Sequence, residues 1–180
     1  GLEVHAQLLT ESKAYSSDPN AYGDRPNTLA GPVTLGLPGT LPVPNTAVID
    51  HAIKLGLACG CTIAPRMHYA RKNYFYPDLP KGYQVTQDTT PICTGGHILI
   101  TEEDGTEKAI ARTRIHMEED AGKSIHDVDP FNTLVDLNRA GVPLLEIVGK
   151  PDLRSAEDAK AYVAELRSIL VAVGASDGKM

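Results

Sequence analysis

Two alternating runs of residues on either side of Asp104-Gly105 constrain the fold of this 180-residue chain more than any other feature. Residues 97–102 and 107–119 alternate between apolar and polar side chains, which is the period of a half-buried β-strand. An Asp-Gly dipeptide between two such runs is a strong hairpin signal. The pattern therefore predicts an antiparallel hairpin, and any fold proposed for the chain must contain it.

Further strands are predicted near both ends of the chain. Residues 2–8 alternate strictly, with Leu2, Val4 and Ala6 on one face of the predicted strand. Residues 133–148 are also extended in composition, with breaks predicted at Gly141 and Pro143. Residues 10–44 are rich in Gly, Pro, Asn and Ser, which predicts a long ordered loop.

Two helices are predicted, and they stand apart from the strands. The first spans residues 46–58 and is stopped by Gly60. The second follows an N-cap at Ser155, carries Asp158 three residues on, and ends at Gly174. Strands dominate and the helices are separate from them, so the predicted class is α+β with a largely antiparallel sheet.

Composition excludes several classes of protein. A net charge of −6 argues against a basic surface that binds the phosphates of nucleic acid. Cys59 and Cys61 form a C-x-C pair with no second pair to complete a zinc site, so we expect reduced thiols. The sequence has no run of 18 apolar residues, and we predict no membrane span.

The segment Arg71–Gln84 concentrates aromatic residues, with four in fourteen positions against 5% for the whole chain. Pro77 and Pro80 would break a helix or a strand ladder, so we predict a shaped loop whose aromatic bodies pack inward. Such loops often carry binding chemistry. A surface loop anchored by its tyrosines is the alternative, and composition does not separate the two.

Three consecutive carboxylates, Glu118, Glu119 and Asp120, end the predicted strand 107–119. They repel one another, so cationic side chains or a metal ion must offset them. Carboxylate oxygens suit Mg²⁺. The alternating pattern places His116 and Glu118 on the polar face of the strand, while Glu119 falls at a position of the apolar face. A solvated acidic turn remains the alternative.

Two other polar residues lie in predicted strands. Glu146 sits in an otherwise apolar run, which indicates either an internal ion pair, with Arg139 as the candidate partner, or a carboxylate held in a cleft. Glu3 and His5 share the polar face of the first strand. A lone His5 would usually be a hydrogen-bonded structural residue, and the neighbouring carboxylate improves the case for a site.

Taken together, these segments resemble the B subunit family of aspartyl/glutamyl-tRNA amidotransferases, specifically its N-terminal catalytic "cradle" region. Motifs of this length, in order along the chain, are far more specific than a short signature. The resemblance rests on Gly1–His5, Gly36–Pro42, Arg71–Asp78, His116–Lys123, Val135–Val148 and Pro151–Ser155.

The resemblance implies a ligase that forms carbon–nitrogen bonds with glutamine as amide donor. Members use ATP and Mg²⁺ to phosphorylate the side-chain carboxylate of Glu or Asp on misacylated tRNA, and ammonia from an amidase A subunit then gives Gln-tRNA(Gln) or Asn-tRNA(Asn). A small C subunit completes the heterotrimer. By the same resemblance, tRNA binds mainly through regions beyond Met180, no membrane is involved, and the location is cytoplasmic, with an organelle not excluded.

The resemblance also implies roles for individual residues. Glu3, His5 and Glu119 match catalytic positions, and with Glu118 they match the surroundings of the Mg²⁺ site; His5 is expected to orient a ligated water, since Mg²⁺ prefers oxygen. We expect the following further roles: Arg71 and Lys72 as phosphate or acyl-group contacts, and Arg139 and Glu146 along a polar ammonia route.

The chain departs from the family pattern at one set of positions. Many members carry four zinc-binding cysteines where this sequence has Ser16, Asp18, Gly31 and Thr34, so no structural zinc is expected. Residues 1–180 are expected to be the N-terminal part of the catalytic cradle domain, with the helical and tRNA-binding tail domains outside this fragment.

Two other classes of function compete with this interpretation. A scaffold that only docks partner subunits would not need clustered carboxylates. An unrelated metal hydrolase would be expected to carry H-E-x-x-H or a nucleophile elbow, and neither pattern is present. Dependence on Mg²⁺ rather than tight Zn²⁺ binding would separate phosphoryl transfer from hydrolysis.

Overall fold

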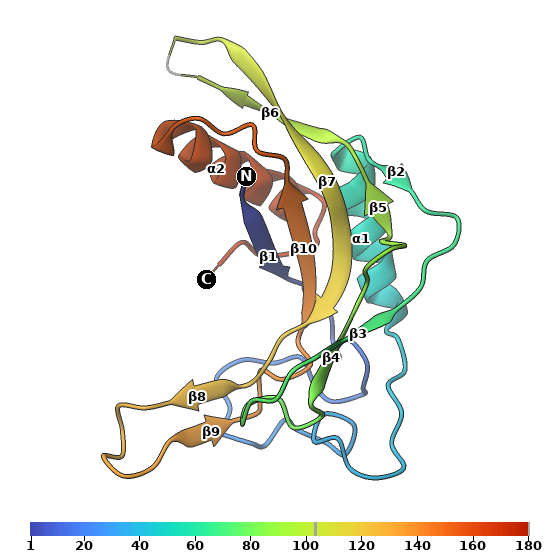
Figure 1. Ribbon diagram of the computed structural model, residues 1–180, viewed down its shortest axis with the longest axis vertical. Coiled ribbons are helices and arrows are strands. Elements are labelled where there is room, and N and C mark those ends of the chain that lie inside the picture. The colour runs from blue at the N-terminus through green and yellow to red at the C-terminus, as the bar shows by residue number, and fades with distance from the viewer. Residues whose placement is uncertain (103, 180) are drawn as a thin grey trace.

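A six-stranded antiparallel sheet is the centre of the molecule (Figure 1). The computed structural model describes residues 1–102 and 104–179. Five strands lie side by side, and β6 (His97–Thr101) pairs with the far part of the long strand β7. The order across the sheet is β1 (Glu3–Gln7), β10 (Pro143–Gly149), β7 (Glu107–Glu119), β5 (Cys93–Thr94) and β2 (Thr62–Ile63).

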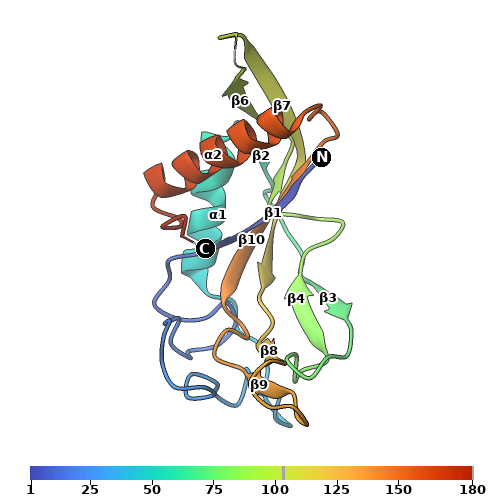
Figure 2. The same ribbon diagram turned by 90° about the vertical axis from the view of Figure 1, so that its left-hand side faces the viewer.

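Two helices cover one face of this sheet, and the other face, on which neither helix lies, is called the open face below (Figure 2). Helix α1 (Thr46–Ala58) begins at Asn45, whose side chain accepts a hydrogen bond from the Ala47 amide. Helix α2 (Ala156–Ala172) begins at Ser155, which accepts from the Asp158 amide at 3.0 Å. The core between helices and sheet is apolar and contains the inward-facing strand residues.

The register separates an apolar face from a polar face. Ala6, Leu145 and Met117 are opposite one another on β1, β10 and β7, and all three are buried in the core. Because side chains alternate along a strand, the residues between them point to the open face. The strands therefore carry their polar side chains together on the side that no helix covers.

The lower half of the molecule in Figure 1 is built from loops and two small hairpins. Most of residues 8–44 form a long loop with a single isolated bridge between Ser12 and Pro19. Ala14, Tyr15 and Val85 form a small separate apolar cluster there. The hairpins pair β3 (Ala70–Asn73) with β4 (Tyr83–Thr86), and β8 (Lys123–Ile125) with β9 (Leu134–Asp136).

The predicted class and most predicted elements are confirmed. The α+β class holds, with antiparallel pairing throughout the described strands. Helix 46–58 and strand 107–119 have the predicted bounds, and the Asp104-Gly105 turn joins β6 to β7. Pro143 opens β10 rather than interrupting it, since the first residue of a strand tolerates proline. Neither helix in the described part of the chain is long and apolar enough to cross a membrane.

The prediction of an inward-packed loop at Arg71–Gln84 is wrong in two respects. Its ends are strands, with Arg71 opposite Val85, and the two prolines lie in the connection rather than in the ladder. Phe75 and Tyr76 are 88% and 66% exposed instead of packed inward. Inward packing does hold for Tyr83, which is partly buried against the cluster of Ala14, Tyr15 and Val85, whereas the turn that carries Phe75 and Tyr76 projects from the hairpin.

Candidate active site

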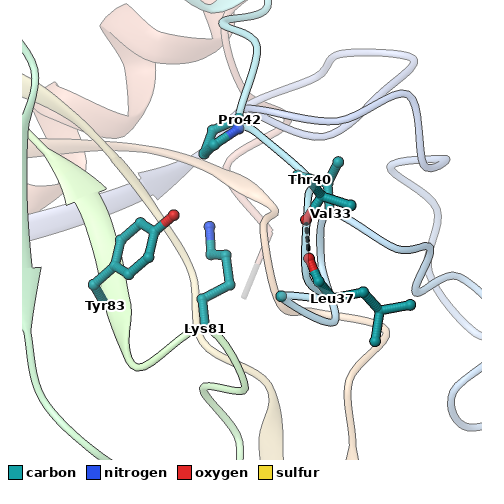
Figure 3. Close-up of a pocket in the computed structure, with 7 residues that line it drawn as sticks. Val33, Leu37, Thr40, Pro42, Lys81 and Tyr83 are labelled. Atoms are coloured by element: carbon teal, nitrogen blue, oxygen red, sulfur yellow. Dashed lines mark hydrogen bonds between the residues drawn. The ribbon is translucent and has the colours of Figure 1, made fainter.

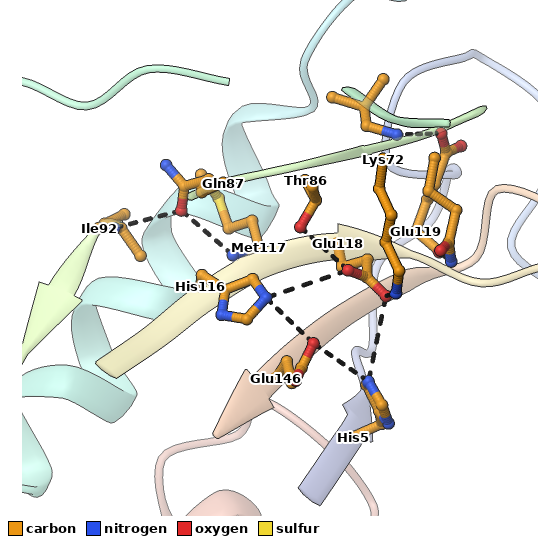
Figure 4. A network of polar contacts seen from close by, with 12 residues as sticks. His5, Lys72, Thr86, Gln87, Ile92, His116, Met117, Glu118, Glu119 and Glu146 are labelled. Carbon is orange, nitrogen blue, oxygen red and sulfur yellow. Dashed lines mark hydrogen bonds and ion pairs between the residues drawn. The ribbon is translucent and has the colours of Figure 1, made fainter. Parts of the chain in front are cut away.

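A row of three polar side chains crosses the open face where β1, β10 and β7 run side by side. Glu146 on β10 lies opposite His5 on β1 and opposite His116 on β7. Directly opposed residues on antiparallel strands bring their side chains into contact. The Glu146 Oε2 is 3.3 Å from His5 Nε2 and 3.0 Å from His116 Nε2. Figure 4 draws Glu146 between the two imidazoles.

Glu118 completes a cluster with His5 and Glu146. One donor atom from each of the three lies within 4.8 Å of the others, a spacing that can hold a metal ion. The two carboxylates are almost enclosed, at 4% and 12% exposed for Glu118 and Glu146, whereas the His5 imidazole is 49% exposed. The cluster is therefore open to solvent on the His5 side and closed on the β7 side.

Neutral and cationic groups from the β3–β4 hairpin contact Glu118. The Thr86 hydroxyl donates to Oε2 at 2.9 Å, and Lys72 Nζ lies 3.6 Å from Oε1. Lys72 is half exposed, so its ammonium is free to move toward another anion. The hairpin thus fixes one oxygen of this carboxylate and leaves a mobile cation beside the other.

His116 is the buried imidazole of the row. Burial lowers the pKa of His116, an effect that the charges of Glu146 and Glu118 oppose without overcoming. The ring therefore lies in an environment that favours its neutral form. It presents Nε2 to Glu146, while Nδ1 is buried without a hydrogen-bond partner among residues 1–102 and 104–179.

Glu119 lies on the other side of β7 and does not join this cluster. Its Oε1 pairs with the Lys81 ammonium and accepts from the Val85 amide at 2.9 Å. Burial raises the pKa of Glu119, and the charge of Lys81 limits the rise. The structure therefore separates Glu119 from His5 and Glu118, and its predicted role as an Mg²⁺ ligand stays a prediction.

A small cavity of about 70 Å³ adjoins the Lys81 side chain (Figure 3). It lies between the 33–42 loop and the start of β4, and Lys81 extends between Tyr83 and Pro42. The Lys81 ammonium is 5.2 Å from the centre of the Tyr83 ring, close enough for a cation–π contact. Lys81 thus has an aromatic wall on one side and a carboxylate on the other.

The remaining predicted residues lie around the cluster or away from it. Glu3 shares the face of His5 but is exposed, with no ion pair or hydrogen bond to its carboxylate in the described chain. Arg71 is exposed above the Tyr83 ring at 5.7 Å. Arg139 donates to the Ala121 and Gly122 carbonyls and does not contact Glu146. The proposed Arg139–Glu146 ion pair is therefore wrong, because the two imidazoles take that place.

The four positions at which the family resemblance implies cysteines, Ser16, Asp18, Gly31 and Thr34, meet in space. The Asp18 Oδ2 accepts from the Gly31 amide at 2.9 Å and from the Thr34 hydroxyl, and the Ser16 hydroxyl accepts from the Asp18 amide. These hydrogen bonds lower the pKa of Asp18 although burial alone would raise it. A carboxylate-centred hydrogen-bond network thus joins the two loop segments here.

Sequence reasoning misses three residues at these sites. His116, Thr86 and Lys81 are absent from the predicted site residues, although the alternating pattern does place His116 on the polar face with Glu118. Thr86 gives no comparable signal, and Lys81 lies in the Arg71–Gln84 segment without an indication of its partner, since the two residues reach their carboxylates across 32 and 38 residues of chain. Strand pairing between distant segments decides such contacts.

The fold and the site define an antiparallel α+β domain with a carboxylate–imidazole cluster on its open face. A family model described as the GatB/GatE catalytic domain matches residues 1–180, and the chain belongs to this family.

Proteins named as the B subunit of aspartyl/glutamyl-tRNA(Asn/Gln) amidotransferase are similar over the whole chain. Identity is 59% to the protein of Anaeromyxobacter sp. (strain Fw109-5), 57% to that of Myxococcus xanthus (strain DK1622) and 57% to that of Halorhodospira halophila (strain DSM 244 / SL1). All 180 residues are aligned, and they span 37–38% of each relative's length.

Proposed function

We propose that this chain supplies the ATP-dependent carboxylate-activating site of a tRNA-dependent amidotransferase. The substrate would be the side-chain carboxylate of Glu or Asp carried by tRNA, in keeping with the names of its relatives. The observation that carries the proposal is the cluster of His5, Glu118 and Glu146 on the open face of the sheet. A domain that only docked partners would have no use for two nearly enclosed carboxylates so close together.

The donor set of the cluster fits Mg²⁺. Two carboxylates from adjacent strands offer oxygen atoms, and the half-exposed side leaves room for water and phosphate, the usual partners of this ion. His5 is a poor direct ligand for so hard an ion, so its imidazole would hold a water or a phosphate oxygen instead. When bound, the ion would neutralise charge on the transferring phosphoryl group.

The cations of β3 would hold the reacting groups above the cluster. Lys72 lies beside Glu118, and Arg71 precedes it on the same strand. In the first step, an oxygen of the substrate carboxylate bonds to the γ-phosphorus of ATP, and the bond from that phosphorus to the bridging oxygen breaks with its electron pair leaving on ADP. Lys72 would stabilise the spreading negative charge, which is the main requirement of phosphoryl transfer.

The second step needs ammonia. Its nitrogen attacks the activated carbonyl carbon, the carbon–oxygen bond to phosphate breaks with its electron pair leaving on inorganic phosphate, and the nitrogen gives up one proton to solvent as the amide forms. We propose that an amidase subunit releases the ammonia from glutamine and that a small third subunit completes the assembly. Arg139 remains a proposed contact along the ammonia route. Glu146 lies inside the cluster, so a role beside the metal has better support than one lining the route.

The proposal is tested by measuring ADP formation by the full-length subunit with its partners, Mg²⁺, ATP and Glu-tRNA(Gln). We expect Glu118→Gln and Glu146→Gln to lower the rate by about 100-fold to 1000-fold, the usual loss when an electrostatic group of the transition state is removed. Glu165→Gln, an exposed substitution on α2, is the matched control and should leave the rate unchanged.

Each other outcome would point elsewhere. Full activity of both cluster variants would contradict the proposal. Absence of ADP formation by the unaltered complex would favour a docking role for this domain. Activity that requires Zn²⁺ rather than Mg²⁺ would favour a metal hydrolase.

A further inference from the structure

We propose that His116 is a positioning residue that holds Glu146 in the metal-binding arrangement through a hydrogen bond from its Nε2–H. The inference rests on the proposed function, because it gives His116 a task within the same cluster. His116 is not one of the three residues whose donor atoms lie within 4.8 Å of one another, which are His5, Glu118 and Glu146. Its role would therefore be exerted through Glu146.

The geometry determines which ring nitrogen carries the hydrogen toward Glu146. The Glu146 Oε2 is 3.0 Å from His116 Nε2, and an ionised carboxylate can only accept hydrogen bonds. A bare nitrogen in that place would set two lone pairs against each other, so Nε2 carries a hydrogen. Glu146 is also the nearest acceptor to the ring in the described residues, since Nδ1 has no partner there and Glu118 Oε2 lies 3.9 Å from Nε2.

The strand register makes this contact rigid. His116 and Glu146 are directly opposed on β7 and β10, two strands paired from Pro143–Glu119 to Val148–Arg114 without a register shift. The neighbouring residues Ile115 and Met117 are fully buried in the core, so the backbone of β7 cannot move at this point without disturbing that packing. His116 therefore offers its N–H from a fixed place.

A second donor plays the same part for the other carboxylate. Thr86 donates to Glu118 Oε2 as His116 donates to Glu146 Oε2, so each carboxylate has one oxygen held from within the protein. Both donors approach their carboxylates from buried positions on β7 and β4. The pair thus orients two negative charges side by side and leaves their attraction for a cation intact, as the hydrogen-bond partners of metal ligands commonly do.

Mn²⁺ serves as the probe for the test, because its binding to the full-length complex can be followed by electron paramagnetic resonance without ATP or turnover. His116→Met removes the donor at similar length and should raise the Mn²⁺ dissociation constant by about 10-fold to 100-fold. His116→Gln keeps an N–H near the position of Nε2. Because the donor to Glu146 is retained, the Mn²⁺ dissociation constant of this variant should lie within about threefold of that of the unaltered complex. His97→Met, an exposed histidine on β6, is the matched control.

A second variant covers the case in which His116→Met does not assemble. His116→Asn keeps a polar side chain but places its amide about where Nδ1 lies, so it should weaken Mn²⁺ binding as His116→Met does. Unchanged binding in either variant would overturn the inference. Equal weakening in the Gln and Met variants would also overturn it, because the loss would then come from packing rather than from the N–H.

Failure of this inference differs from failure of the proposed function. If Glu118→Gln weakens Mn²⁺ binding while His116→Met does not, the metal site stands and His116 has no positioning role. If neither substitution affects Mn²⁺ binding, the ion lies elsewhere and both ideas fall.

Discussion

Glu118 and Glu119 are consecutive residues at the end of β7, yet their carboxylates face opposite sides of the strand and contact different groups. Glu118 faces the open side of the sheet, where a hydroxyl holds it and a half-exposed lysine lies beside it. Glu119 faces the loop region, where the Lys81 ammonium and the Val85 amide contact the same oxygen. Both side chains are nearly inaccessible to solvent.

The difference lies in how each charge is compensated. Lys81 is itself only 7% exposed, so its ion pair with Glu119 is enclosed by the protein and shielded from solvent. Burying an ion pair stabilises a fold only weakly, but removing one partner is costly because the other charge is left without compensation. Glu118 and Glu146, in contrast, form no ion pair with an enclosed lysine or arginine within the described residues. The Glu119 region therefore fits a structural role, and the Glu118 region fits a site that accepts a cation from solution.

The largest effect on stability is expected for Lys81→Met. The substitution leaves the buried Glu119 carboxylate with the Val85 amide alone, and we expect the free energy of unfolding to fall by about 3–5 kcal/mol. Urea unfolding of the full-length subunit measures it. A loss below about 1 kcal/mol, which is typical of exposed ion pairs, would show that the Lys81–Glu119 pair is accessible to solvent rather than enclosed.

An effect on the pH dependence of stability is expected for Lys13, a second buried lysine on the Glu119 side. Its ammonium donates to the Leu29 carbonyl at 2.6 Å, and burial lowers the pKa of Lys13 from 10.5 to about 8. Between these two values the unfolded chain binds more protons than the folded chain, so the Lys13 contribution to stability rises with pH.

Comparison of Lys13→Met with the unaltered protein isolates this contribution. The difference in unfolding free energy should shift in favour of the unaltered protein as pH rises from 8 to 10.5. A constant difference across that window would mean that Lys13 is solvated like an ordinary surface lysine.

The smallest effect on stability is expected for Lys72→Met. Because Lys72 is 54% exposed, its pair with Glu118 should contribute less than about 1 kcal/mol to the free energy of unfolding. Its effect should appear in function instead, as a rise in the KM for ATP of about 10-fold to 150-fold, the change expected when one charge-assisted contact of about 1.5–3 kcal/mol is lost. An unchanged KM together with a large loss of stability would reverse the comparison between the two regions.

The sequence is sufficient to predict the elements and the faces of β7. The alternation in residues 107–119 predicts the strand with its observed bounds, and its parity places Glu118 and Glu119 on opposite faces. Local turn and cap residues do the same for α1 and for the β6–β7 hairpin. These features depend on neighbours in sequence, which is why the pattern carries them.

The alternating pattern does not predict which side chains contact one another across neighbouring strands. The expected partner of Glu146 is Arg139, seven residues away, whereas its actual partners His5 and His116 are supplied by two other strands. The expected grouping of Glu119 with His5 also conflicts with the alternating pattern, which places Glu118 and Glu119 on opposite faces of the strand. Strand order and register are set by the whole core, so a single sequence provides no means of choosing among these pairings.

The most direct test of the central claim follows an oxygen atom from the substrate carboxylate. The full-length complex would be given Glu-tRNA(Gln) labelled with ¹⁸O in the side-chain carboxylate, together with ATP, Mg²⁺ and glutamine. If phosphoryl transfer to that carboxylate occurs at the His5–Glu118–Glu146 cluster, one labelled oxygen must appear in inorganic phosphate, and Glu118→Gln must slow the formation of this product by about 100-fold to 1000-fold. Unlabelled phosphate formed alongside the amide, or label transfer that survives Glu118→Gln at the normal rate, would contradict the account.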